Sequence, residues 1–179
     1  AEGFFEDGLL LCRDASTGLY SFVKQDGTAA FSASFAAAGA FSDGLALVRS
    51  ADSGYLVLDT EGKTVAALEA GADPAYYTVY GGDTVVMTNG TNYALYSISK
   101  GAYLTDFLYN VVSEFHDGAA MVRQINRWGI IDTKAKLLTN PTYYYLSYMG
   151  EGLYAARSED GSVAAVDASG NIAYRTLTY

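Results

Sequence analysis

A turn of the form Phe-x-Asp-Gly recurs along this chain of 179 residues and limits the possible folds more than any other feature. Clear copies occupy residues 5–8, 41–44 and 115–118, and looser copies occupy residues 80–83 and 149–152. Equivalent positions in successive copies lie 34 to 39 residues apart. Such a period is typical of repeat proteins, in which one unit cannot bury its own faces and packs on its neighbours.

The residues between the turns predict short β-strands. Each turn is followed by four or five apolar residues, as at 45–48 and 119–122, which suits a strand buried on both faces. After a polar connection an aromatic residue opens a second strand at Tyr20, Tyr55, Tyr93 and Trp128, with Val163 in the last copy. A third strand follows, as at 64–67 and 136–139, and a fourth segment, as at 35–41 and 109–115, leads into the next turn.

We therefore predict an all-β repeat protein of five short four-stranded units. The units span about residues 5–34, 41–73, 80–108, 115–142 and 149–179, within a single domain at 1–179. A five-bladed β-propeller is favoured over an open β-solenoid-like stack. The step from Gly152 through Tyr179 and on to Gly8 is again 35 residues, so we expect the termini to meet, with Tyr179 close to Phe4.

The fourth copy resembles the bacterial WG repeat family, also called the KWG repeat. The resemblance rests on the segment WGIID at 128–132, preceded by Phe115, Asp117 and Gly118. The second copy keeps its turn and also Tyr55, Asp59, Gly62 and Lys63. Ser21, Leu56, Ala94 and Ala164 replace the motif's glycine elsewhere, so those copies are degenerate. The resemblance implies an all-β repeat protein and brings no common enzymatic activity.

Composition excludes several classes of function. The formal net charge is −9, which disfavours nucleic acid and anionic membrane surfaces as partners. No run of about 18 apolar residues occurs, so we expect no membrane insertion. Cys12 is the only cysteine, which excludes an intrachain disulfide and a cysteine-based zinc site. It aligns with apolar positions of the other copies, so we interpret it as a buried apolar residue.

The residues with chemical potential have structural interpretations. His116, the only histidine, occupies a turn position that also takes Glu, Ser and Gly, so it is interpreted as a surface turn residue. One acidic residue per copy (Asp7, Asp43, Asp117, Glu151) is expected to hold its turn through its own backbone. Four arginines share one repeat position: Arg13, Arg49, Arg123 and Arg157. We expect them to pair with Asp59, Asp132 or Asp167, with an anion-binding rim as the alternative.

Two dense tyrosine clusters are the candidate ligand-binding residues. One comprises Tyr143, Tyr144, Tyr145 and Tyr148, and the other comprises Tyr76 and Tyr77. Strand alternation sends some of these rings into the core and leaves others exposed, where tyrosine can stack on sugars or anchor a protein partner. Packing in the core is the competing interpretation.

No nucleophile, phosphate-loop or metal-ligand motif occurs, so we expect no catalytic residue, no metal site and no cofactor. The sequence favours a non-enzymatic binding or interaction module that presents one face of the repeat array to an unknown protein or glycan. A carbohydrate-binding, lectin-like domain is the alternative, and a hydrolase is a more distant one. The acidic, tyrosine-rich and lysine-poor composition, with the family resemblance, favours a bacterial protein in an extracytoplasmic or cell-surface location.

Overall fold

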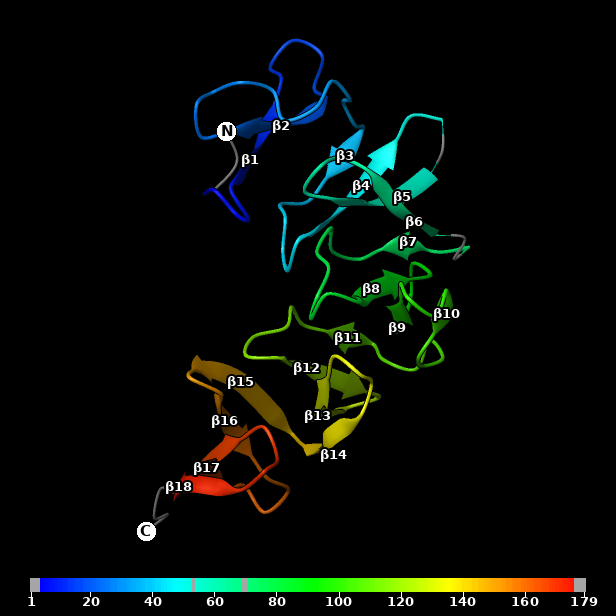
Figure 1. The fold of residues 1–179 in the computed structure, drawn as a ribbon. Coiled ribbons are helices and arrows are strands. Elements are labelled where there is room, and N and C mark those ends of the chain that lie inside the picture. Colours follow the sequence, from blue (N-terminus) through cyan, green and yellow to red (C-terminus); the bar gives the residue numbers. More distant parts are fainter. Residues whose placement is uncertain (1–3, 53, 69–70, 176–179) are drawn as a thin grey trace. The chain divides into compact units, whose positions relative to one another are not determined.

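The computed structural model describes residues 4–52, 54–68 and 71–175, and these contain 18 β-strands and no helix (Figure 1). The strands form one two-stranded and four four-stranded sheets, all antiparallel and each in chain order. Sheet 1 contains β1 (Leu9–Arg13) and β2 (Tyr20–Lys24). Sheet 2 contains β3 (Ala37–Ala38), β4 (Leu45–Ser50), β5 (Gly54–Asp59) and β6 (Thr64–Leu68). The all-β prediction is therefore confirmed.

The remaining three sheets repeat this pattern. Sheet 3 contains β7 (Asp73–Pro74), β8 (Thr84–Thr88), β9 (Tyr93–Ser97) and β10 (Ala102–Tyr103). Sheet 4 contains β11 (Val111–Val112), β12 (Ala119–Gln124), β13 (Arg127–Asp132) and β14 (Leu137–Tyr143). Sheet 5 contains β15 (Tyr145–Gly150), β16 (Leu153–Arg157), β17 (Val163–Asp167) and β18 (Ile172–Arg175).

The chain divides into two compact units, and the division passes through sheet 3. One unit comprises Ala1–Val85 and Tyr96–Ala102, and the other comprises Val86–Leu95 and Tyr103–Tyr179. Sheets 1 and 2 therefore belong to the first unit, and sheets 4 and 5 to the second.

The fourth segments predicted at 35–41 and 109–115 contain the first strand of the following sheet. Residues 37–38 form β3, which pairs with β4, and residues 145–150 form β15, which pairs with β16. In sheet 1 only β1 and β2 form a ladder, and isolated bridges from Tyr20 to Phe35 and from Val23 to Ala29 extend it. A first strand for sheet 1, and the predicted meeting of the termini, would involve residues 1–3 and 176–179, which lie outside the described residues.

The recurrent Asp-Gly pair forms a two-residue hairpin turn. Asp7 and Gly8 have φ values of 49° and 79°, and the flanking Glu6 and Leu9 exchange two backbone hydrogen bonds of 2.9 Å. Positive φ at both central residues defines the type I′ turn, whose twist suits antiparallel strands and which favours Asp-Gly. The turns at 43–44, 117–118 and 151–152 share this positive-φ pair.

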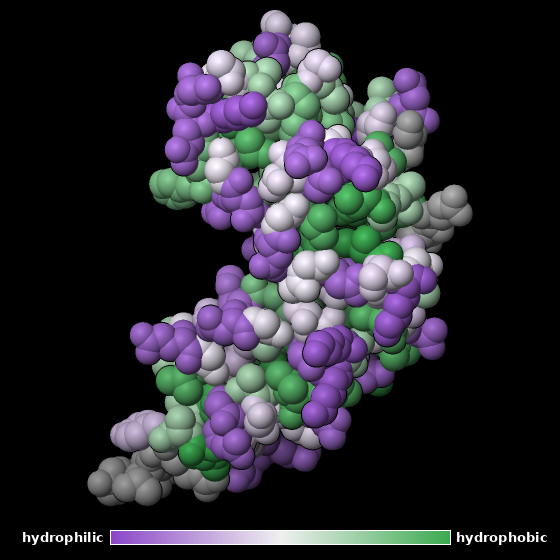
Figure 2. Space-filling model, viewed as in Figure 1, coloured by the Kyte–Doolittle hydropathy of each residue, from purple (hydrophilic) through white to green (hydrophobic). Residues whose placement is uncertain are grey.

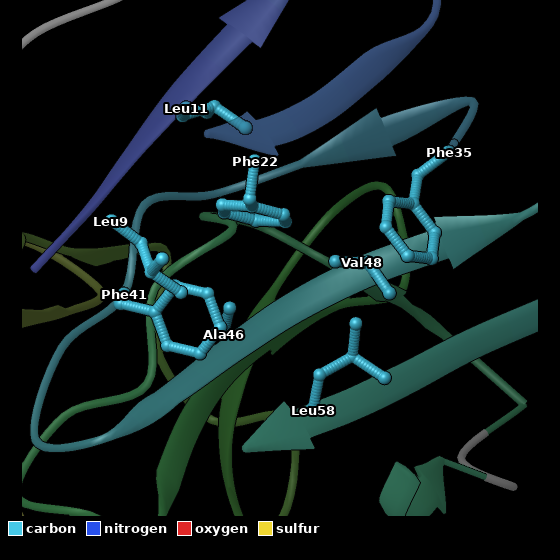
Figure 3. Close-up of a cluster of buried hydrophobic side chains, with 8 residues drawn as sticks. All are labelled: Leu9, Leu11, Phe22, Phe35, Phe41, Ala46, Val48 and Leu58. Atoms are coloured by element: carbon cyan, nitrogen blue, oxygen red, sulfur yellow. The ribbon is translucent and has the colours of Figure 1, made fainter. Parts of the chain in front are cut away.

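Within each unit, one sheet buries a face against the sheet that follows it. In the first unit Leu9, Leu11 and Phe22 of sheet 1 pack on Ala46, Val48 and Leu58 of sheet 2, together with Phe35 and Phe41 (Figure 3). In the second unit Ala119 and Ile130 of sheet 4 pack on Leu146, Tyr154, Ala156 and Val166 of sheet 5. The two clusters use equivalent repeat positions, so one sheet-to-sheet interface recurs in the chain.

Candidate binding site

The tyrosines at 143–148 divide between the interior and the surface. Tyr143 ends β14 and, with Tyr148 on β15, packs half-buried against the interface between sheets 4 and 5. Tyr144 and Tyr145 are exposed by 40% and 51%. Core packing therefore describes Tyr143 and Tyr148, and surface exposure describes Tyr144 and Tyr145.

Tyr144 lies in a polar group between sheets 4 and 5. The guanidinium carbon of Arg127, the first residue of β13, lies 3.5 Å from the centre of the Tyr144 ring. The Tyr144 hydroxyl donates to a carboxylate oxygen of Glu159 at 3.3 Å, and Arg127 forms an ion pair with the same oxygen at 3.8 Å. Cation–π stacking and the carboxylate therefore hold an exposed tyrosine in one place.

The hairpin before Arg127 adds an exposed apolar residue in an unusual conformation. Ile125 lies between β12 and β13 with a φ of 57° and is 77% exposed. A β-branched residue is disfavoured in this region, and such outliers are concentrated at functional sites. Asn126 accepts hydrogen bonds from Arg123 at 3.1 Å and Arg127 at 3.3 Å, and these bonds hold the hairpin turn between β12 and β13 in place. Ile125, Arg127, Tyr144 and Glu159 are called the edge cluster below.

Tyr145 belongs to a different surface. It pairs with Arg157 in the ladder of β15 and β16 and, with Ala155 and Val163, lines an open depression of about 320 Å³ on sheet 5. This depression is apolar apart from the Arg157 guanidinium and the Tyr145 hydroxyl.

Tyr148 contacts the Asp117-Gly118 turn of the preceding repeat. Its hydroxyl donates to the Asp117 carboxylate, and its ring stacks on His116 with centroids 4.7 Å apart. The hydrogen bond to Asp117 is the main reason that the pKa of Tyr148 is raised, and burial raises it further. Its neighbour Tyr154 is buried, which raises the pKa of that hydroxyl to about 12. His116 is thus an exposed turn residue, as predicted, that also covers a tyrosine of the next sheet.

Tyr76 and Tyr77 belong to the first unit and are half-buried. The Tyr77 ring packs edge-on against Tyr55, whose hydroxyl donates to Asp73 at 2.6 Å. Burial and this hydrogen bond raise the pKa of Tyr55. The Tyr77 carbonyl also lies against Gly39, where an added Cβ would come within 1.5 Å of the oxygen. These contacts give Tyr77 a packing role.

Two of the acidic turn residues, Asp7 and Asp117, contact the next repeat, which differs from the expected bond within their own turn. A carboxylate oxygen of Asp7 accepts a hydrogen bond from the backbone N–H of Gly44 at 2.8 Å. The Asp117 carboxylate accepts one from Gly152 at 2.9 Å. Backbone hydrogen bonds close the turn itself, so the carboxylate is available to link one sheet to the next.

Three of the four repeated arginines stack on aromatic rings, which corrects the prediction that they pair with aspartates. Arg13, Arg49 and Arg123 lie 5.5 to 5.8 Å from the rings of Tyr20, Tyr55 and Trp128, their cross-strand partners. The aspartates lie at the other end of these hairpins. Each of Asp59, Asp132 and Asp167 accepts backbone N–H groups two and four residues later, which holds its turn.

Cys12 is half-buried, which corrects its interpretation as a buried residue. The equivalent Val48, Val122 and Ala156 are almost fully buried. Val48 and Ala156 are covered by the preceding sheet of their unit, whereas Cys12 lies on the face of sheet 1 that points away from sheet 2.

Sequence reasoning missed Ile125, Arg127 and Glu159. They lie in or next to the connections between strands, where residue types differ from repeat to repeat, so the repeat pattern gave no signal for them. In the part of the chain that the structure describes, no three His, Cys, Asp or Glu side chains are grouped to hold a metal ion. Within the same residues, no helix is long and apolar enough to cross a membrane.

Solved structures that resemble this chain are distant in sequence. Hsv2 from Kluyveromyces lactis, a β-propeller, is 12% identical with a TM-score of 0.55, over 94% of this chain and 59% of that one. BamB from Moraxella catarrhalis is 16% identical with a TM-score of 0.48, over 98% and 61%. This chain therefore spans about 60% of the length of these structures. The likeness to Hsv2 confirms a β-propeller type of fold, and it shows the fold alone.

A search of curated proteins found no match. Residues 128–161, from Trp128 at the motif to the loop after β16, match the family model described as WG containing repeat. This match confirms the predicted resemblance to WG repeats for residues 128–161, which cover parts of the fourth and fifth predicted repeats.

Proposed function

We propose that this chain is a non-enzymatic interaction module that binds a protein partner through the edge cluster. The observation that carries the proposal is the exposed Tyr144, held between the Arg127 guanidinium and Glu159. The exposed Ile125 lies two residues before Arg127 in the same hairpin. Tyrosine and arginine are enriched at the energetic centres of protein interfaces, and a ring already fixed in place loses little entropy on binding. The propeller-type fold is a suitable scaffold for such a surface.

The absence of enzymatic activity remains part of the proposal. The carboxylates that recur in the repeats have structural contacts: Asp7 and Asp117 bond the turn of the next repeat, and Asp59, Asp132 and Asp167 hold turns. Hydrolysis of glycosides needs two carboxyl groups that converge on one bond, and these groups are bound to separate turns.

The test compares capture of binding partners by matched variants. We expect a protein that the wild-type chain retains from extracts of its native source to be lost with Tyr144→Ala and with Arg127→Ala. Val65→Ala, at a position 48% exposed on β6, serves as the control and retains the partner. Circular dichroism confirms that each variant is folded. Equal recovery with all four proteins would contradict the proposal.

Carbohydrate binding is the second candidate, because an exposed tyrosine beside a carboxylate and a guanidinium also suits a sugar. A glycan array distinguishes the two: binding that is lost in Tyr144→Ala favours the lectin-like function. The extracytoplasmic or cell-surface location also remains a proposal, supported by the acidic, lysine-poor composition. Fractionation of the native cells tests that location.

A further inference from the structure

The outer face of sheet 5 is apolar and exposed. Tyr145, Met149, Val163 and Tyr174 on this face are exposed by 51%, 61%, 42% and 68%. Together with Ala155 and Ala165 they line two adjoining open depressions of about 320 and about 160 Å³. Figure 2 shows hydrophobic side chains at the surface over β15–β18. An exposed apolar patch of this kind marks an interaction surface.

The repeat shows what kind of surface fits this face. In sheet 4 the face that carries Ala119, Met121, Trp128 and Ile130 packs on sheet 5. In sheet 1 the equivalent residues Leu9, Leu11, Tyr20 and Phe22 pack on sheet 2. Equivalent positions are found by counting from the turn glycine on the first hairpin strand and from the first aromatic position on the second. In sheet 5 these positions are Leu153, Ala155, Val163 and Ala165. The exposed face is therefore the one that covers a following sheet elsewhere in the chain.

The chain also carries the complementary face. The residues that sheets 2 and 5 offer to the preceding sheet include Ala46, Val48 and Leu58, and Tyr154, Ala156 and Val166. In sheet 1 the equivalent side chains are Leu10, Cys12, Ser21 and Val23, which are half-buried. Both halves of the recurrent interface are thus present, one on sheet 1 and one on sheet 5.

We propose that the outer face of sheet 5 binds sheet 1 of a second copy of this chain, through the interface that joins sheet 4 to sheet 5 within one copy. The contact is head-to-tail, so each copy binds one neighbour through its sheet 5 face and another through its sheet 1 face, which is called the acceptor face below. It would bury Val163, Ala165 and Tyr174 of one copy against Leu10, Cys12 and Val23 of the other. This inference does not depend on the edge cluster.

Sedimentation of the 179-residue chain tests the association. We expect the wild-type mass to rise with concentration beyond that of one copy. Val163→Glu on sheet 5 and Val23→Glu on sheet 1 should each abolish this rise. An equimolar mixture of the two variants should form a dimer and nothing larger, because only one intact pair of faces remains. Val65→Glu is the charge-matched control and should associate like the wild type.

Cys12 supplies a second measurement, because it is the only cysteine and lies on the acceptor face. In the variant Ala165→Cys, mild oxidation should join Cys12 of one copy to the new cysteine of the next and give a ladder of disulfide-linked oligomers. The wild type can give no product larger than a linked pair.

Two results would overturn the proposal. One is a wild-type mass equal to a single copy at every concentration. The other is a disulfide in Ala165→Cys that forms within one chain, which would show that the chain's own first sheet covers the face. A failure of Tyr144→Ala to lose its partner would contradict the proposed function and leave this association unaffected.

Discussion

At the scale of single residues, the glycine of the Trp-Gly motif is required by a close backbone approach. A Cβ on Gly129 would lie 2.5 Å from the Thr139 carbonyl oxygen and 2.8 Å from the Pro141 nitrogen. β14 crosses there with a bulge, since Trp128 pairs with Tyr143 and Ile130 pairs with Thr139. Backbone atoms cannot move aside as a flexible side chain can.

We therefore expect Gly129→Ala to lower the free energy of unfolding by about 2 kcal/mol, the typical cost of overpacking a rigid site. Urea denaturation measures it. Ser21→Ala, at the equivalent position of the first repeat, is the control and should change stability by less than about 0.5 kcal/mol. Equal effects of the two substitutions would show that the close approach does not restrict residue 129.

A second prediction concerns alkaline pH. Burial raises the pKa of Tyr154 to about 12 from a reference value of 10.0. Above pH 10 the unfolded chain loses this proton while the folded chain keeps it, so stability is full below that pH and falls as pH rises towards 12. Tyr154→Phe should reduce this alkaline loss, as measured by denaturation at several pH values. An identical pH dependence in both proteins would exclude Tyr154 as a cause.

At the scale of the elements, the Asp-Gly turns act as links between sheets. Asp117→Asn keeps a residue that tolerates positive φ but removes the charge that accepts bonds from Gly152 and Tyr148. The expected cost is about 1 kcal/mol, because these bonds are partly exposed to water. Asp43→Asn is the control, since among the described residues no hydrogen bond joins that carboxylate to the next turn. A cost no larger than the control's would show that the link is energetically neutral.

The elements were the most predictable part of this protein, and the contacts between them were the least. The Asp-Gly turns and apolar runs predicted strands such as β4, β12 and β16, because local sequence determines a two-residue hairpin. Alternation of polar and apolar residues could not show to which sheet the fourth segment of a repeat belongs. That assignment depends on backbone pairing with the strand that follows the next turn, as β3 pairs with β4. For the same reason the arginines were assigned to aspartates, although cross-strand register places Arg123 beside Trp128.

At the scale of the whole molecule, the repeat period predicted the series of sheets but could not identify the site. The edge cluster depends on Arg127, Tyr144 and Glu159, which come from β13 and from two connections. The other repeats carry different residue types at the positions of Arg127 and Tyr144. Tyr144 was among the predicted residues because tyrosines are dense there, and its neighbours were found only from the structure.

The repeat architecture makes a last prediction about how the molecule unfolds. Each sheet contacts only adjacent sheets in such proteins, so a defect between two sheets should act locally. Leu146 is 4% exposed and belongs to the cluster that holds Ile130 and Trp128. Leu146→Ala should cost about 3 kcal/mol, as for other large-to-small changes in a core. Because Trp128 is the only tryptophan, its fluorescence reports on this interface alone.

We expect the fluorescence transition of Leu146→Ala to occur at lower urea concentration than the transition seen by circular dichroism, which averages over all sheets. In the wild-type chain the two transitions should lie closer together. Leu11→Ala, in the equivalent cluster between sheets 1 and 2, is the matched control and should leave the Trp128 transition nearly unchanged. If both variants shifted both signals equally, the sheets would unfold as one cooperative body, and nearest-neighbour contacts alone could not explain the stability of the repeats.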